Sequence, residues 1–299
     1  MNKHKVSFVL GTYNRKIFLK LTIQSIRSEA LNIPHEIIVV DGGSTDGTLH
    51  WLMKQKDVIT ILQHNRGSWR GEKIVRRSWG YFMNLGFKCA QGKYICMLSD
   101  DCILVPGAVN NGLKLVEERT NKEENVGACA FYFRSWPDEK RYYVSKVLEK
   151  TFNVNHGLFL REALEKIQYI DENRYAFYYG DIDLALRLVD AGYVVIDSPT
   201  SFVEHTLHAD NDTRKSNITR SDEDFFHFKE KWGNQISLLD KNAAIKNQEI
   251  ESNKLHSTVN ALKVSSQLKK LNFKYVFVLL RHKIGIRERT LKIKNYVSK

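Results

Sequence analysis

Val6-Ser-Phe-Val-Leu-Gly-Thr-Tyr-Asn-Arg15 and Glu36-Ile-Ile-Val-Val-Asp-Gly-Gly-Ser-Thr-Asp-Gly-Thr48 are the two stretches of this sequence that decide its fold. Each is a short apolar run that ends abruptly in polar, glycine-rich residues. Continuous apolar runs are typical of strands buried on both faces. Between them, Ile17 to Ile26 carries apolar residues at helical spacing. About 30 residues separate the two runs, which predicts a strand–helix–strand unit.

The same alternation continues along the first half of the chain. It predicts a mostly parallel α/β sheet of the Rossmann-like type, flanked by helices. The further strands are expected at Val58 to Leu62, Lys93 to Leu98 and Gly127 to Phe133, and the further helices at Thr48 to Lys54, Val75 to Ala90 and Pro106 to Glu118. Gly80 and Gly86 weaken the helix expected from Val75.

Polar or acidic residues follow three of the predicted strands, at Gly11 to Arg15, Asp41 to Thr48 and Ser99 to Asp101. Ligands bind beyond the carboxyl ends of parallel strands, so these segments are candidates for one site. Each segment alone also fits turn formers and helix caps. The sequence has no Walker loop and no GxGxxG. Carboxylates at strand ends instead favour a divalent metal that holds a phosphate.

Charge divides the 299 residues into two parts. The net charge is +12, and Lys241 to Lys299 contributes 14 basic residues and three Glu, a net of +11. We therefore expect a near-neutral body at 1–239 and a basic helical appendage at 240–299. The sequence contains no run of about 18 apolar residues, so we expect no transmembrane helix. No secretory signal precedes the first strand, and the four cysteines form no CxxC pair. Both observations favour a cytoplasmic protein with ordinary thiols.

An ordered set of motifs resembles glycosyltransferase family 2, which has the GT-A fold. The set consists of VSFVLGTYNR, EIIVVDGGSTDGT, Asn84-x-Gly86-x3-Ala90-x-Gly92, LSDD, YYGDIDLALRLVDAGYVVIDSP, FVEH and FKEKWG, and spans Val6 to Gly233. The resemblance implies a metal-dependent inverting transferase that uses Mn²⁺ or Mg²⁺. Its donor would be a nucleotide-diphosphate sugar, with UDP or dTDP favoured. Its acceptor would be a glycan, lipid-linked or free, in the synthesis of a bacterial-type surface polysaccharide.

The resemblance also implies roles for individual residues. Asp181 would be the general base, because it matches the Asp of the family's ED motif; an N-cap of the following helix is the alternative. Asp101 matches the last acid of the DxD motif and would bind the metal with His205, for which His208 competes. The nucleotide-binding residues would be Thr12, Tyr13, Asn14, Arg15, Asp41, Gly43 and Asp100, of which Asp41 would bind the base.

Two positions depart from the family pattern. Ser99 stands where DxD has its first Asp, and Gly180 stands where the ED motif has Glu. Asp183 is a candidate substitute for that Glu on the acceptor side, or part of a solvated helix face. These departures motivate a second hypothesis, a non-catalytic nucleotide-sugar or glycan-binding protein. A sugar-phosphate nucleotidyltransferase fits less well, because its glycine-rich loop with a basic residue is absent after the first strand.

A basic cluster precedes the fourth predicted strand. Its members are Arg66, Arg70, Lys73, Arg76 and Arg77. Arg77 and its neighbours would meet a diphosphate or an anionic acceptor, or form a solvated face.

The appendage has its own pattern. Ala243 to Leu271 predicts a helical hairpin or a weak oligomerisation helix. The apolar run after Leu271 is flanked by Lys and Arg, which favours an anionic membrane surface at the inner face of the cell membrane. Contact with a partner, with a second copy of the chain or with the body itself are the alternatives. No nucleic-acid motif accompanies the charge, so we expect no nucleic-acid partner.

Overall fold

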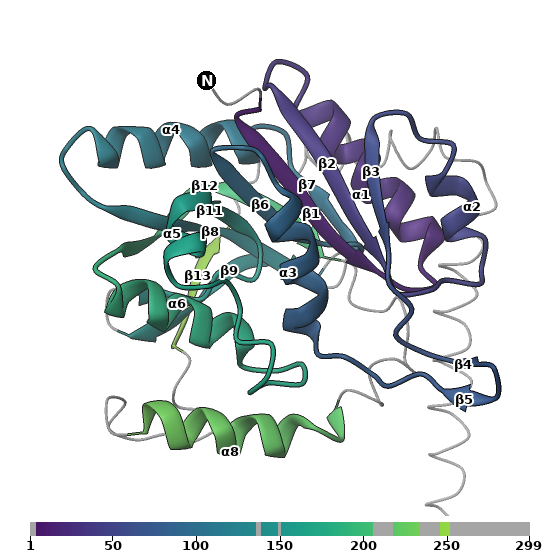
Figure 1. Cartoon of the computed structure of the whole chain (residues 1–299). Coiled ribbons are helices and arrows are strands. Elements are labelled where there is room, and N and C mark those ends of the chain that lie inside the picture. The colour runs from purple at the N-terminus through teal and green to yellow at the C-terminus, as the bar shows by residue number, and fades with distance from the viewer. Residues whose placement is uncertain (1–3, 136–138, 149–150, 206–217, 234–245, 252–299) are drawn as a thin grey trace, which may run out of the picture. The chain divides into compact units, whose positions relative to one another are not determined.

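The computed structural model describes residues 4–135, 139–148, 151–205, 218–233 and 246–251. A central sheet runs through the compact unit that ends at Glu251 (Figure 1). Its strands are β1 (Val6–Thr12), β2 (His35–Asp41), β3 (Val58–Leu62), β6 (Tyr94–Ser99), β7 (Cys102–Leu104), β8 (Val126–Ser135), β9 (Arg141–Leu148), β10 (Thr151–Phe152), β11 (Gly157–Leu160), β12 (Val194–His205) and β13 (Lys246–Glu251). A small separate hairpin consists of β4 (Ser68–Trp69) and β5 (Glu72–Lys73).

Helices cover both faces of the sheet. They are α1 (Lys16–Glu29), α2 (Thr48–Leu52), α3 (Trp79–Cys89), α4 (Ala108–Thr120), α5 (Arg161–Lys166), α6 (Gly180–Asp190) and α8 (Ser221–Trp232). Side chains alternate across β1: Phe8 and Leu10 pack into the core that holds α1 and α4, whereas Val9 packs into the core that holds α3, α5 and α6. This alternation is the period of two that a strand imposes on its side chains.

The parallel half of the sheet is confirmed. β1 lies between β2 and β6 and is parallel to both, and β2 is parallel to β3. In register, Thr12 faces Asp41 and Gly11 faces Ser99. The three polar strand ends picked out from the sequence therefore meet at one edge of the sheet.

The other half makes the sheet mixed. The strand predicted at Gly127 to Phe133 is the centre of β8, but it does not lie next to β6. The short strand β11 pairs antiparallel with both of them. β9, β10 and β13 extend this half through further antiparallel pairs. The sequence pattern predicted none of the strands β9, β11 and β12, which follow β8 in the chain.

The helix expected from Val75 begins four residues later, at Trp79. Ser78 caps it, because its Oγ accepts a hydrogen bond from the backbone N–H of Tyr81 at 3.1 Å. The glycines inside the helix have a packing role. A Cβ on Gly86 would lie 2.4 Å from Cγ1 of Val9, so glycine is what allows α3 to approach β1.

The helix predicted over Ala243 to Leu271 is wrong for Lys246–Glu251, which form β13 and pair antiparallel with β9. The rest of the predicted appendage, and with it the predicted membrane, partner and oligomer contacts, lies outside the described residues. Among the residues that the structure describes, no helix has the length and apolar character needed to cross a membrane.

Candidate active site

Two adjacent carboxylates lie at the end of β6 and share one arginine. Arg15 Nη1 is 2.9 Å from Asp100 Oδ1 and 3.2 Å from Asp101 Oδ2. Thr12, at the end of β1, donates its hydroxyl to Asp100 Oδ2 at 2.7 Å. Both aspartates are buried. Thr12 and Arg15 therefore hold the acidic pair in place, and the guanidinium of Arg15 puts a positive charge beside it.

The two carboxyls differ in their affinity for a proton. Burial raises the pKa of Asp100 to about 6, against the opposing charge of Arg15. Burial also works against ionisation of Asp101. There, however, the hydrogen bond and charge of His205, together with Arg15, lower the pKa below its ordinary value. Asp101 is therefore the more firmly anionic member of the pair, as a metal ligand should be.

The two carboxylate oxygens of Asp41 differ in their partners. One accepts hydrogen bonds in the turn that follows β2, and the other accepts none from the described residues. Oδ1 accepts the backbone N–H groups of Gly43 and Ser44 at 2.8 and 2.7 Å. Oδ2 is buried and has no hydrogen-bond partner in the described part of the chain. The turn-capping interpretation is thus correct for one oxygen. The other is a buried acceptor, and such groups usually have a donor.

Gly43 supplies the backbone conformation of this turn. Its φ is +90°, and a Cβ there would lie 2.4 Å from Nδ1 of His64. We expect Gly43→Ala to lower the free energy of unfolding by about 1–2 kcal/mol from the left-handed conformation alone, and by more from the clash. Thermal unfolding measures the effect. Gly47→Ala is the matched control, because φ is +85° but its Cβ would meet only the movable Lys16 Nζ at 3.0 Å. Equal losses in both variants would contradict the role given to His64.

Asp181 lies in the first turn of α6 and is not its N-cap. That position belongs to Tyr179, which has a φ of 64°. Oδ2 of Asp181 accepts the side-chain amides of Asn153 and Asn155 at 2.9 and 2.8 Å. Burial raises the pKa of the carboxyl above its ordinary value, against these hydrogen bonds. The two amides fix the direction of the carboxylate, and the raised pKa makes it a stronger base.

A cavity of about 210 Å³ joins these elements. Strand ends and following loops supply one wall, through Gly11, Thr12, Tyr13, Arg15, Gly42, Met97, Leu98, Ser99 and Asp100. The remaining lining residues are Asn65, Arg66, Arg76, Arg77, Ser78, Trp79, Phe82, Met83, Asn155, Ala176 and Phe177. Four arginines therefore line a cavity that is also bordered by Asn155, the hydrogen-bond partner of Asp181. Such a lining suits an anionic ligand that carries phosphates.

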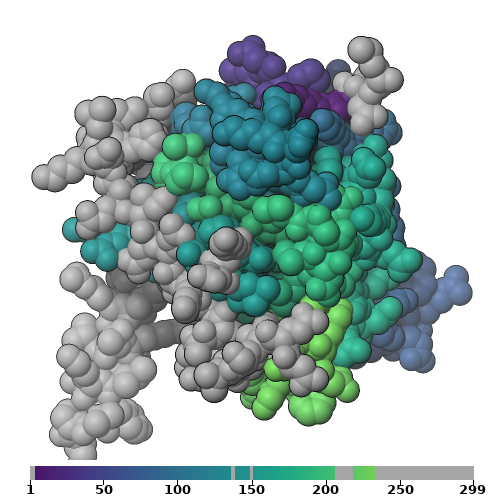
Figure 2. All heavy atoms as spheres, turned by 90° about the vertical axis from the view of Figure 1, so that its left-hand side faces the viewer, coloured from purple at the N-terminus to yellow at the C-terminus, as the bar shows by residue number. Residues whose placement is uncertain are grey.

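One carboxylate of α8 holds the far wall of the cavity. Asp224 accepts the backbone N–H groups of Ala176, Phe177 and Tyr178 at 2.6, 2.9 and 2.8 Å. Phe228 and Trp232 of the same helix pack with residues of α6, and Figure 2 shows α8 in yellow-green against the green surface above it. The loop that leads to Asp181 is thus fixed by a helix much later in the sequence.

His205 ends β12 and reaches the acidic pair from another element. Its Nε2 lies 3.2 Å from Asp101 Oδ1. Its Nδ1 is buried and, within the described ranges, has no hydrogen-bond partner. A carboxylate and an imidazole that converge in this way are a donor set that a divalent cation accepts. The residues present therefore fit the metal that the resemblance implies.

Five of the predicted site residues line the cavity, namely Thr12, Tyr13, Arg15, Arg77 and Asp100. The other described ones lie outside its lining, namely Asn14, Asp41, Gly43, Asp101, Asp181, Asp183 and His205. Asp183 is fully buried beneath it: its carboxylate contacts Arg187, Lys231, Trp232 and Tyr175, so it forms neither a solvated face nor an acceptor site. Asn14 braces the loop after β2, where its Oδ1 accepts the backbone N–H of Thr45 at 2.7 Å. His208 lies outside the described residues.

The sequence did not single out Asn153, Asn155 or His156. The three lie just before β11, one of the strands that periodicity missed, and no motif marks them. Arg66 and Arg76 were identified only as part of a basic cluster, and both line the cavity with Arg77.

The family model for glycosyl transferase family 2 matches residues 7–168. The chain belongs to this family. The matched residues contain β1, β2 and β6 with their polar ends, as well as Asn153 and Asn155. Asp181, His205 and α8 follow the matched segment.

Curated relatives of this family 2 chain are distant. An uncharacterized glycosyltransferase, YfnE, of Bacillus subtilis (strain 168) is 26% identical over 171 residues, which are 53% of this chain and 40% of that protein. An uncharacterized glycosyltransferase of Rickettsia prowazekii (strain Madrid E) is 24% identical over 219 residues, which are 68% of this chain and 64% of that protein. The chain thus spans less than two thirds of either relative.

Solved structures show the same fold. The mannosyltransferase PcManGT from Pyrobaculum calidifontis, in complex with GDP-Man and Mn²⁺, superposes with a TM-score of 0.55 at 20% identity, covering 77% of this chain and 64% of that one. Staphylococcus aureus TarS gives a TM-score of 0.51 at 14% identity, covering 80% of this chain and 44% of that one. The predicted α/β architecture of the GT-A type is confirmed, with the mixed sheet described above.

Proposed function

We propose that this family 2 chain transfers a sugar from a nucleotide-diphosphate donor to a hydroxyl group of a glycan acceptor, with inversion at the anomeric carbon. One observation carries the proposal. The cavity is lined by the strand-end carboxylate of Asp100, by four arginines and by Asn155, whose side chain holds the candidate base Asp181. Candidate donor-binding groups and an amide that holds the candidate base therefore border a single space, as a single displacement requires.

The nucleotide would lie against the ends of β1 and β2. The unpartnered Oδ2 of Asp41 accepts one N–H from the base, since Oδ1 already serves the turn. Uracil and thymine present one such N–H on their imide, whereas guanine presents two donor groups side by side. This difference favours UDP or dTDP over GDP as the donor nucleotide, although the mannosyltransferase above was solved with GDP-Man.

Asp101 and His205 would hold a divalent cation, Mn²⁺ or Mg²⁺, together with the diphosphate. When bound, such a cation neutralises the charge that develops on the leaving diphosphate. Arg15, Arg66, Arg76 and Arg77 contribute further positive charge around the same groups. On the acceptor side, Asp181 takes the proton of the incoming hydroxyl, and Asn153 and Asn155 keep its carboxylate in position.

The test is a thermal-shift screen of the full chain with UDP, dTDP, GDP and their sugar conjugates, with and without MnCl₂. Binding to the native state alone raises stability by about 2.7 kcal/mol at a hundredfold excess over Kd. We expect a metal-dependent shift with a uridine or thymidine diphosphate, absent in Asp41→Ala and retained in Asp57→Ala, an exposed aspartate that pairs with Arg27. The absence of a shift with any nucleotide in the folded protein would contradict a donor site. Binding without turnover would favour the non-catalytic alternative.

A further inference from the structure

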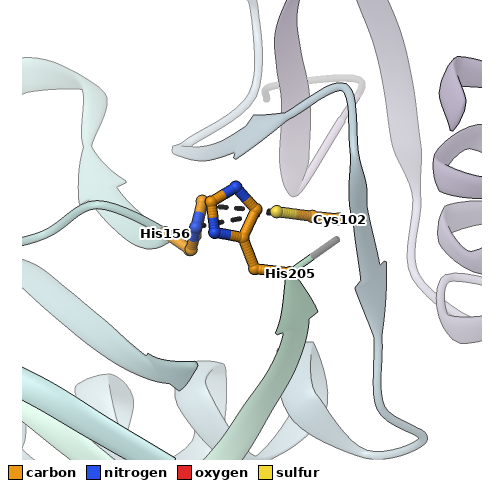
Figure 3. A group of neighbouring side chains, drawn as sticks. All are labelled: Cys102, His156 and His205. Atoms are coloured by element: carbon orange, nitrogen blue, oxygen red, sulfur yellow. Dashed lines mark hydrogen bonds between the residues drawn. The ribbon is translucent and has the colours of Figure 1, made fainter. Parts of the chain in front are cut away.

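A thiol and two imidazoles lie together beside the acidic pair, from three separate segments of the chain. Cys102 begins β7, His156 precedes β11, and His205 ends β12 (Figure 3). One candidate ligand atom from each residue lies within 4.8 Å of the other two. Cys102 and His156 are buried, and His205 is partly exposed, so an ion could enter from the His205 side.

The distances are those of ligands around one ion. Sγ of Cys102 is 3.6 Å from Nε2 and 3.8 Å from Nδ1 of His156. A sulfur and a nitrogen ligand on one tetrahedral zinc ion, at bond lengths of about 2.3 and 2.05 Å, lie about 3.6 Å apart. The Sγ–Nε2 separation is therefore that of two zinc ligands, but Sγ lies almost equally far from Nδ1, so the His156 ring must turn to point one nitrogen at a shared ion.

His205 is oriented to complete the set. Its Nε2 faces the carboxylate of Asp101 at 3.2 Å, which leaves the buried and unpartnered Nδ1 as the nitrogen that can ligate. A metal-bound histidine commonly gives its other ring nitrogen to a carboxylate in this way. His156 is buried beside His205, with ring centroids 5.4 Å apart, and offers a second imidazole nitrogen.

We propose that Cys102, His156 and His205 bind a borderline-soft divalent cation, Zn²⁺ above all, at a site distinct from the oxygen-rich position of Mn²⁺ or Mg²⁺. Thiolate and imidazole ligands select zinc and cobalt, whereas oxygen ligands select magnesium and manganese. The Cys102 thiol must lose its proton to ligate a metal. Binding therefore releases the thiol proton to solvent as the metal–sulfur bond forms.

The probe is Co²⁺ added without nucleotide to the full chain after treatment with a chelator. We expect one Co²⁺ per chain, an intense thiolate-to-cobalt charge-transfer absorption and the visible bands of a tetrahedral site, all displaced by Zn²⁺. Cys102→Ser should abolish the charge-transfer band. His156→Gln should keep the band but weaken Co²⁺ binding by at least about 100-fold, more than the usual effect of an outer-shell change.

The control is Cys89→Ser, which removes the exposed thiol and should leave the absorption unchanged. Thermal unfolding of each variant shows whether it is folded, and His156→Gln serves if Cys102→Ser is not. Cobalt absorption without a charge-transfer band, or a band that survives in folded Cys102→Ser, would overturn the proposal.

The zinc site and the Mn²⁺ or Mg²⁺ site of the proposed function both use His205, so the two metals should compete. This expectation rests on the proposed function. Zn²⁺ should reduce the nucleotide- and Mn²⁺-dependent thermal shift of the wild-type chain, but not that of Cys102→Ser. An intact cobalt band without this competition would overturn the sharing alone. A wild-type chain that binds Co²⁺ but no nucleotide would overturn the proposed donor site and leave the zinc site standing.

Discussion

Asp181→Asn is expected to lower kcat by about 10²- to 10⁴-fold while the affinity for the donor nucleotide stays unchanged, because the variant removes a general base and nothing from the donor side. The amide oxygen of Asn can still accept hydrogen bonds from Asn153 and Asn155, so the local structure should persist. Turnover with the donor found in the screen, and nucleotide binding by calorimetry, measure the two quantities separately.

The pH dependence of the wild-type enzyme gives a second readout. The pKa of Asp181 is raised by burial, so the carboxylate becomes protonated at a higher pH than an ordinary Asp. Activity should therefore fall as the pH is lowered through that raised pKa, and Asp181→Asn should lack this limb. Asp190→Asn, at an exposed position of the same helix, is the control and should behave as the wild type. Unchanged turnover in Asp181→Asn would remove the residue from the role of base.

Asp183→Ala is expected to lower the free energy of unfolding by about 3 kcal/mol, near the lower end for breaking a buried ion pair. The carboxylate is fully buried, with Arg187 Nε at 2.7 Å and both Lys231 Nζ and Trp232 Nε1 at 2.8 Å. Lys231 keeps a quarter of its side chain exposed, and that access to water limits the cost of losing its partner. Chemical denaturation measures the loss.

The same carboxylate links stability to pH. Burial opposes its ionisation, but Lys231, Arg187 and Trp232 outweigh burial and lower the pKa of Asp183. A lowered native pKa contributes stability above the unfolded pKa, and this contribution is lost as the pH falls through the native pKa. The wild type should therefore lose more stability in acid than Asp183→Ala does. Asp190→Ala is the exposed control, and a loss as large as that of Asp183→Ala would contradict the buried network.

The sequence was sufficient to predict the parallel half of the fold and the meeting of its polar strand ends at one edge. Apolar runs that end in polar segments predicted β1, β2 and β6, and parallel pairing brought Thr12, Asp41 and Asp100 to one edge. These contacts follow from strand order alone, because parallel neighbours end on the same side.

The acceptor side could not be read in the same way. Asn153 and Asn155 matter because β11 inserts between β6 and β8, a pairing between segments far apart in the chain. Cys102 had no visible partner in the sequence, since His156 and His205 come from distant segments. Asp183 was misplaced because helical spacing does not show that a later helix, α8, covers that face with Lys231 and Trp232.

Asp224 accepts hydrogen bonds from three successive backbone N–H groups, and these bonds limit how this enzyme could be shortened or recombined. The match to the family model ends at residue 168, whereas α8, whose Asp224 holds the backbone of Ala176 and Phe177 at the cavity, begins at Ser221. A fragment trimmed to the matched segment would keep the polar strand ends and lose the helix that holds this part of the cavity wall. Exchanging this wall of the cavity between relatives therefore requires moving the loop and its distant helix together.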